Sequence, residues 1–270
     1  MAHCAHIPAF VLHQVTCQFA TGDTLFGPLN LSLESSLCGL VGRNGVGKTC
    51  LLRLLAGLDS PADGHIERAA SIAWVAQQPN VTPEMTLAAL LGYAPIFDAL
   101  SRLEQGQVLA ADFDLLDGHW DLPDRLSLAF READLPPFSA DRPVFSLSGG
   151  ERMKALLCGA FVSGADYLLL DEPTNHLDRQ GREWLYHQLE SWQGGALIAS
   201  HDRELLTRMP RIIELTPTAL RSYGGNYDEY QRQRMAEQQA ARAALEHAVT
   251  ERPVSYTHLR AHETAANLVC

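Results

Sequence analysis

An eight-residue segment, Gly42 to Thr49, limits the fold of this chain more than any other part of its sequence. It reads GRNGVGKT and fits the pattern G-x-x-x-x-G-K-[ST], in which a glycine-rich loop brings its backbone N–H groups close to phosphate oxygens. Lys48 supplies a compact positive charge for the β- and γ-phosphates, and the Thr49 hydroxyl suits Mg²⁺. The segment predicts a site for a nucleoside triphosphate and magnesium.

The residues on either side of this loop support that prediction against a chance match in a glycine-rich loop. Residues 37–41 form a short apolar run typical of a strand, and residues 49–58 carry leucines spaced as in a buried helix. A strand, a loop and a helix in this order place the N-terminus of the helix at the anion, where its N–H groups and dipole stabilise negative charge.

Short apolar runs alternate with helical patterns through the rest of the chain. This alternation predicts an α/β fold with a mostly parallel core sheet that is covered on both faces. Residues 10–19 and 25–33 indicate an N-terminal antiparallel β region, and residues 86–135 show helical periodicity interrupted by glycine and proline. Further strands are expected at residues 71–76, 167–170 and 195–199, and further helices at residues 152–161 and 179–192.

A second group of polar residues follows the apolar run 167–170. Asp171 is placed to hold Mg²⁺ beside Thr49, and Glu172 is placed to polarise an attacking water molecule. An acidic pair at a strand end can also be merely solvated. The phosphate-binding segment upstream favours the catalytic interpretation, because parallel strands bring ligands to their carboxyl ends.

The composition restricts the class of protein. The 270 residues carry a formal charge of −11, which argues against a nucleic-acid-binding surface over most of the chain but does not exclude a local basic patch. Six cysteines stand singly, as expected of reduced thiols in the cytosol. No apolar run is long enough to insert into a membrane, and residues 1–6 lack a secretory signal. A cytoplasmic protein is expected.

The order of the motifs resembles that of an ATP-binding cassette (ABC) ATPase domain. After the phosphate loop come Gln77, the sequence LSGGE at 147–151, LLLDE at 168–172 and Ser200-His201-Asp202. The resemblance covers about residues 7–225 and implies a helical signature subdomain at about residues 80–160. It also implies that two cassettes close head-to-tail around two ATP molecules.

The resemblance implies a role for each matching residue. Glu172 is expected to be the general base, with Gln77 and His201 beside the γ-phosphate, whereas Gln78 is a weaker alternative to Gln77. Thr49, Gln77 and Asp171 are the expected Mg²⁺ ligands. Asp178 resembles the residue that links the two sites. The expected nucleotide-binding residues are Phe19, Gly42, Asn44, Gly45, Gly47, Lys48, Thr49, Cys50, Ser148, Gly149 and Gly150.

Two of these expectations have structural alternatives. Phe19 resembles the aromatic residue that stacks on adenine, but Phe26 competes for the role and either side chain could belong to the core. Ser148 with its two glycines resembles the signature that contacts the γ-phosphate bound by the partner cassette. A serine followed by glycines is also a common helix cap.

Two segments resemble the F subgroup (ABC-F), whose members are soluble tandem-cassette ATPases that act on ribosomes. They are PTNHLD at 173–178 and YGGNYDEY at 223–230. The resemblance implies that residues 226–252 begin an interdomain linker helix directed toward ribosome-bound tRNA. A solvated C-terminal helix and, for the whole chain, the ATP-binding subunit of a membrane transporter are the alternatives.

The chain departs from the F subgroup in several ways. No second cassette follows, so the partner is expected to be a cassette of a longer chain or a second copy. Residues 231–247 mix arginine with glutamate, although such linkers are usually basic. The 70 residues between Gln77 and Ser148 leave open whether a short arm is inserted.

Residues 253–270 fit nothing before them. The segment VSYTHLRAHET at 254–264 resembles a translated sequencing-library adapter, and NLVC at 267–270 resembles its continuation. We therefore expect the genuine sequence to stop near Arg252 and give no weight to His258, His262 or Cys270 as metal ligands. A genuine disordered tail is the alternative.

Overall fold

The computed structural model describes residues 8–19, 21–107 and 109–250. The chain divides into two compact units after Tyr227, and each is considered by itself. The expectations for residues 1–6 and 253–270 concern parts of the chain outside the described residues.

Within the described residues, the strands of the first unit form two sheets. The smaller sheet is antiparallel with the order β2-β1-β4, and the larger has the order β5-β6-β7-β3-β8-β9. Five strands of the larger sheet run parallel, and β9 pairs antiparallel with β8. The predicted fold class, with its antiparallel N-terminal region, is confirmed. The larger sheet contains β3 (Leu37–Val41), β5 (Ile72–Val75), β6 (Tyr167–Asp171), β7 (Gly195–Ala199), β8 (Arg211–Thr216) and β9 (Ala219–Gly224).

The antiparallel sheet contains one strand that the sequence pattern did not predict. The predicted strands are observed as β1 (Phe10–Gln18) and β2 (Thr24–Leu33), whereas β4 (Asp63–Arg68) is not among the predicted strands. Its sequence, DGHIER, is mostly polar, and every residue except Ile66 is exposed. The strand is defined by its pairing with β1, and composition gives no signal for that pairing.

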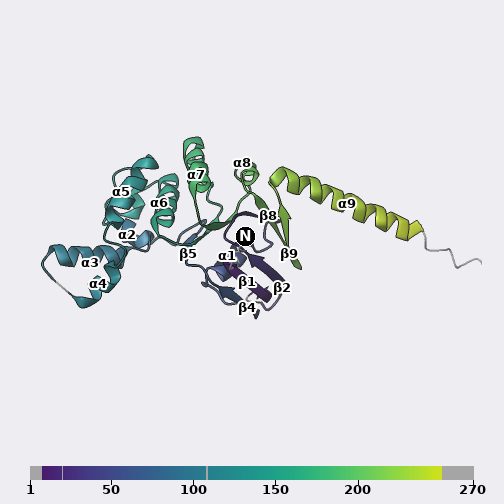
Figure 1. Cartoon of the computed structure of the whole chain (residues 1–270), viewed down its shortest axis with the longest axis horizontal. Helices are drawn as coiled ribbons and strands as arrows, with labels where there is room; N and C mark the ends of the chain where they lie inside the picture. The colour runs from purple at the N-terminus through teal and green to yellow at the C-terminus, as the bar shows by residue number, and fades with distance from the viewer. Residues whose placement is uncertain (1–7, 20, 108, 251–270) are drawn as a thin grey trace, which may run out of the picture. The chain divides into compact units, whose positions relative to one another are not determined.

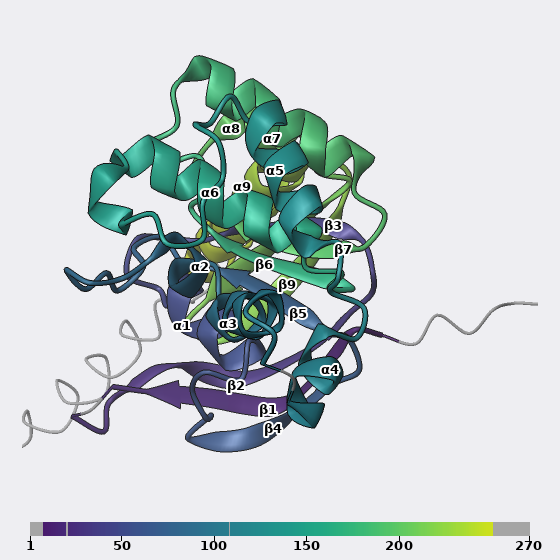
Figure 2. The same cartoon turned by 90° about the vertical axis from the view of Figure 1, so that its left-hand side faces the viewer.

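The first helix lies between the two sheets. Helix α1 (Lys48–Leu55) begins inside the phosphate loop and buries Leu51, Leu52, Leu54 and Leu55. These leucines join one hydrophobic core with residues from both sheets, including Phe10 and Tyr167. Figure 2 shows α1 between the antiparallel strands and the larger sheet, with α7 and α8 on the other side of that sheet. This packing fixes the start of α1 against the carboxyl edge of the parallel strands.

A helical region lies to one side of the sheets and has a core of its own (Figure 1). Leu87, Leu116, Leu122, Leu126 and Phe130 form much of this core. The predicted helix at 152–161 is longer than expected, because Ser148 caps it and the helix begins at Gly149, three residues before the first predicted position. The region comprises α2 (Leu87–Leu90), α3 (Ala94–Glu104), α4 (Ala110–Leu116), α5 (Leu122–Glu132), the 3₁₀ helix η1 (Val144–Ser146) and α6 (Gly149–Val162).

Three further helices complete the described chain. Helices α7 (Arg179–Ser191) and α8 (Arg203–Thr207) follow β6 and β7 in the sequence. Helix α9 (Tyr227–Thr250) begins at the last residue of the first unit and contains all the described residues of the second. Across residues 8–19, 21–107 and 109–250, we find no helix with the length and apolarity needed to cross a membrane.

Candidate nucleotide site

A cavity of about 480 Å³ lies at the carboxyl edge of the larger sheet. The edge gathers polar residues because β6, β7 and β3 are neighbours and each ends in a functional segment. Most of the predicted site residues line this one cavity, but Gly42, Ser148, Gly149 and Gly150 do not. The lining residues are Phe19, Leu25, Asn44, Gly45, Gly47, Lys48, Thr49, Cys50, Gln77, Asp171, Glu172, Asn175 and His201.

The phosphate loop folds as its glycines predict. Gly45 and Gly47 have φ angles of 77° and 103°, in the left-handed region that glycine enters without steric cost. A Cβ atom on Gly47 would lie 2.8 Å from the Phe26 ring, so the loop packs directly on the core. Gly42 begins the loop, and a Cβ there would lie 2.7 Å from the carbonyl oxygen of Leu215 in β8. Gly42 therefore allows the start of the loop to pack closely against β8.

Lys48 reaches back across the loop it terminates. Its Nζ donates to the Gly42 carbonyl at 3.2 Å and lies 3.2 Å from Nε2 of His201. Burial lowers the pKa of Lys48, and the carboxylates of Glu172 and Asp171 oppose this change. The ammonium is thus held beside two acidic groups at the mouth of a loop of N–H donors, an arrangement suited to phosphate oxygens.

The residues predicted to hold magnesium are in contact. The Thr49 hydroxyl donates to Oδ2 of Asp171 at 2.7 Å, which joins the start of α1 to the end of β6. Burial raises the pKa of Asp171, although the Thr49 hydrogen bond and the Lys48 charge act in the opposite direction. Oxygen donors from a hydroxyl and a desolvated carboxylate fit a hard divalent cation, because its charge would offset the cost of burying the carboxylate.

Glu172 and His201 form the second contact at this edge. Oε2 of Glu172 accepts a hydrogen bond from the His201 backbone at 3.2 Å, and Oε1 lies 3.4 Å from His201 Nε2. Burial raises the pKa of Glu172, while the nearby His201 lowers it to a smaller extent. Glu172 has a φ of 49°, unusual for a residue other than glycine. A carboxylate of raised basicity in such a backbone conformation is characteristic of a functional position.

The two phenylalanine candidates occupy different environments. Phe19 is 53% exposed and lines the cavity, whereas Phe26 is fully buried beneath the phosphate loop. Only Phe19 therefore presents a ring to a ligand. Leu25 and Asn175 also line the cavity and had no predicted role. The donation from Asn175 N to the Glu172 carbonyl, at 3.1 Å, is a turn contact that the PTN sequence alone could have suggested.

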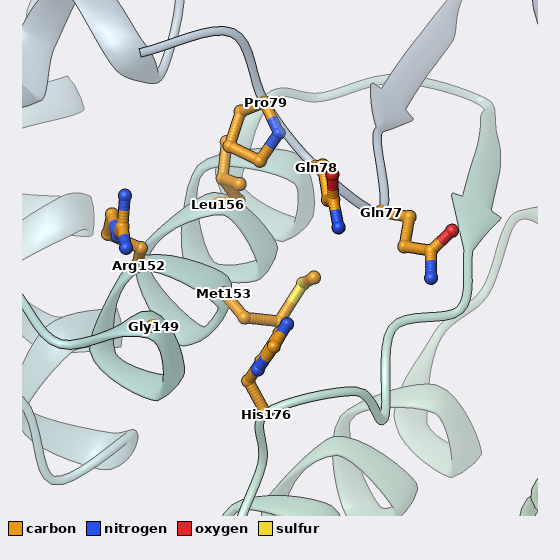
Figure 3. Close-up of a pocket in the computed structure, with 8 residues that line it drawn as sticks. All are labelled: Gln77, Gln78, Pro79, Gly149, Arg152, Met153, Leu156 and His176. Carbon is orange, nitrogen blue, oxygen red and sulfur yellow. The ribbon is translucent and has the colours of Figure 1, made fainter.

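The two glutamines that follow β5 face different spaces. Gln77 lines the nucleotide cavity and also a second cavity of about 310 Å³, whereas Gln78 lines only the second. Figure 3 shows the Gln77 amide directed away from Met153 and His176. This geometry favours Gln77 over Gln78 as the residue that reaches the nucleotide.

The signature residues lie away from the phosphate loop of their own chain. Ser148 caps α6: its hydroxyl accepts from the Glu151 N–H at 3.2 Å, and the Glu151 carboxylate accepts from the Ser148 N–H at 2.8 Å. Asp178 likewise caps α7 through the Gly181 N–H at 2.8 Å. Ser148 therefore has the helix-cap role. The N-terminus of α6 does not line the nucleotide cavity of the same chain.

The adjacent glycines of the signature differ in the space around them, which gives a matched pair of variants. A Cβ on Gly150 would lie 2.7 Å from the backbone oxygen of His176, but a Cβ on Gly149 would meet only the His176 ring at 3.7 Å. Gly150→Ala is expected to lower the free energy of unfolding by about 1–3 kcal/mol, because backbone must move. Gly149→Ala is expected to leave it unchanged or slightly higher. Urea denaturation checks both, and equal midpoints would contradict the prediction.

The phosphate loop and the paired carboxylates at the carboxyl edge of a parallel sheet define a P-loop nucleotide-binding protein. A family model described as "ABC transporter" matches residues 27–175. The chain therefore belongs to the ATP-binding cassette family.

Curated relatives agree with the F-subgroup resemblance. The chain is 34% identical to the energy-dependent translational throttle protein EttA of Mycobacterium tuberculosis, over 92% of this chain and 46% of the relative. Its identity to EttA of Escherichia coli K12 is 34%, over 80% of this chain and 43% of the relative. Its identity to the probable ATP-binding protein YheS of the same strain is 35%, over 75% of this chain and 34% of the relative. These relatives are F-subgroup members, which confirms the resemblance, and the chain spans less than half of their length.

Solved structures share the fold at low sequence identity. An ATP-binding subunit of an ABC transporter aligns with a TM-score of 0.64 at 19% identity, over 83% of this chain and 92% of that one. The dimeric post-hydrolysis state of the ATP-binding cassette MJ0796 bound to ADP and Pi gives 0.63 at 20% identity, over 80% and 98%. These likenesses support the cassette fold.

Proposed function

We propose that this chain is the MgATP-binding and hydrolysing cassette of a cytoplasmic, ribosome-associated translation factor of the F subgroup. The assignment of ATP hydrolysis rests on one observation. Thr49 is hydrogen-bonded to Asp171, Glu172 contacts His201, and all four residues line one cavity. The ribosomal part rests on the relatives named as translational throttle proteins and on the segments 173–178 and 223–230.

In this proposal the phosphate loop and Lys48 bind the triphosphate, and Phe19 stacks on the base. Thr49, Asp171 and Gln77 would hold Mg²⁺, which supplies charge neutralisation between the β- and γ-phosphates when bound. Glu172 accepts a proton from the attacking water, a role that its raised pKa favours. His201, beside both Lys48 and Glu172, orients the γ-phosphate and the carboxylate.

A second cassette completes the site in this proposal. Ser148 is exposed and, with Gly149 and Gly150, lies outside the nucleotide cavity of its own chain. The N–H groups at the start of α6 are suited to an anion, so they are assigned to the nucleotide of a partner cassette. The partner is either a second cassette of a longer chain or a second copy of this one.

Sedimentation with ribosomes tests the function. The Glu172→Gln variant, mixed with bacterial ribosomes and ATP, is expected to pellet with them through a sucrose cushion, and to stay in the supernatant with ADP. The retained ATP would hold the closed cassette pair that engages the ribosome. Absence from the pellet in both nucleotides would overturn the ribosomal assignment. Co-purification with a membrane protein would favour the transporter-subunit alternative.

A further inference from the structure

Three side chains with metal-binding atoms meet on the antiparallel sheet, outside the nucleotide cavity. They are His13 on β1 and His65 and Glu67 on β4, and one ligand atom from each lies within 4.8 Å of the others. None of the three lines the nucleotide cavity. They therefore form a separate cluster, which we call the His–His–Glu cluster.

The strand register brings the cluster together. His13 and His65 are directly paired across the antiparallel β1–β4 ladder. Glu67 is two residues beyond His65, so it projects from the same face of β4. The neighbouring pair, Leu12 and Ile66, belongs to the opposite face, and Leu12 is buried in the core. The cluster thus lies on the outward face, where the backbone holds its members in fixed register.

One separation within the cluster matches that of ligands on a single metal ion, and the other is slightly longer. Oε1 of Glu67 lies 3.3 Å from Nε2 of His13 and 3.8 Å from Nε2 of His65. Ligands bound tetrahedrally to Zn²⁺ at about 2.0–2.2 Å are separated from one another by about 3.3–3.6 Å. The imidazole rings stack with centroids 4.5 Å apart and planes 18° from parallel, so one ring must turn about its side-chain bonds to aim both Nε2 lone pairs at one ion. The His65 side chain is 67% exposed, which leaves it room to do so.

A second observation concerns the Nε2 atom of His13. This atom is covered, although the His13 side chain as a whole is 44% exposed, and it has no hydrogen-bond partner among the described residues. Glu67 Oε1 lies 3.3 Å away. The contact has the length but not the direction of a hydrogen bond. A buried imidazole nitrogen without such a partner has a lone pair or a proton left uncompensated, which coordination to a cation would satisfy.

We propose that the His–His–Glu cluster binds a divalent transition-metal ion of the Zn²⁺ class. Two imidazole nitrogens and one carboxylate oxygen provide three ligands, and water provides the fourth. Imidazole ligands select such ions over Mg²⁺, which prefers oxygen. The bound ion links β1 to β4 across the sheet and so stabilises the strand that ends just before Phe19.

Metal titration of the nucleotide-free chain tests the proposal. Calorimetry with Zn²⁺, and the visible spectrum with Co²⁺, should show one equivalent that is lost in His13→Ala and in the conservative variant Glu67→Gln. An excess of Mg²⁺ should not displace it. Saturating Zn²⁺ should raise the Tm of the parent chain by about 5 °C at a hundredfold excess over Kd, and should not raise that of the variants.

The surface pair of His187 and Glu190 supplies the control. Their side chains approach to 3.7 Å, but among the described residues no third metal-binding side chain gathers with them, so His187→Ala should leave the bound equivalent intact. Because other histidines can bind metal weakly, the comparison between variants decides the result. The proposal is overturned if His13→Ala and Glu67→Gln retain the same stoichiometry and affinity as His187→Ala.

Discussion

Glu172→Gln is expected to reduce ATP hydrolysis by about 10²–10⁴-fold while ATP binding is retained, because the amide cannot accept the proton of the attacking water. The substitution keeps the size of the side chain and an oxygen that can accept the His201 backbone N–H, now 3.2 Å from the carboxylate. The turnover rate is measured by phosphate release, and the affinity by equilibrium dialysis with ATP.

The matched control is Glu104→Gln, which makes the same chemical change at an exposed position near the end of α3. Its turnover and affinity should equal those of the parent chain. If Glu172→Gln hydrolyses ATP within tenfold of the parent rate, Glu172 is not the general base. If it loses ATP affinity as well, the carboxylate serves the geometry of the cavity rather than the chemistry.

Lys48→Ala is expected to weaken ATP binding by about 10- to 150-fold. Hydrogen bonds from charged groups contribute about 1.5–3 kcal/mol each, and about 1.4 kcal/mol corresponds to a factor of ten. Removal of the lysine side chain also takes away the positive charge that offsets the carboxylates of Asp171 and Glu172 in the parent chain. The same titration with AMP should show little change, because the lysine serves the outer phosphates.

The only other lysine of the sequence, Lys154, gives the control for this experiment. Its Nζ donates to the carbonyl of Ala133 in the helical region, and the residue does not line the nucleotide cavity. Lys154→Ala should therefore bind ATP as the parent chain does. Equal losses of ATP and AMP affinity in Lys48→Ala would instead indicate a general collapse of the loop.

The nucleotide cavity was largely predictable because its parts are local in sequence. The loop before α1 and the acidic end of β6 follow short apolar strands, and adjacent parallel strands deliver their carboxyl ends to one edge. Leu25 was missed as a lining residue because it reaches the cavity from β2, where it packs against Gly47 of the phosphate loop. That tertiary arrangement has no counterpart in the spacing of residues.

The antiparallel sheet and the helical region were less predictable. Strand β4 carries no alternating apolar pattern, since its outward face and most of its inward face remain exposed, and only the ladder with β1 defines it. The helices between residues 86 and 135 share one periodicity broken by glycines and prolines. Their boundaries are set by packing around Leu116, Leu122 and Phe130, which sequence spacing alone does not locate.

The contrast between Gly149 and Gly150 has an evolutionary consequence. A library of variants selected only for folded protein should lose substitutions at position 150, where the carbonyl of His176 leaves no room for a side chain, and should retain small residues at position 149. Position 150 would thus be constrained by folding alone, whether or not nucleotide binds. If position 149 tolerates fewer residues in functional sequences than in that library, the difference would measure selection for contact with the partner cassette.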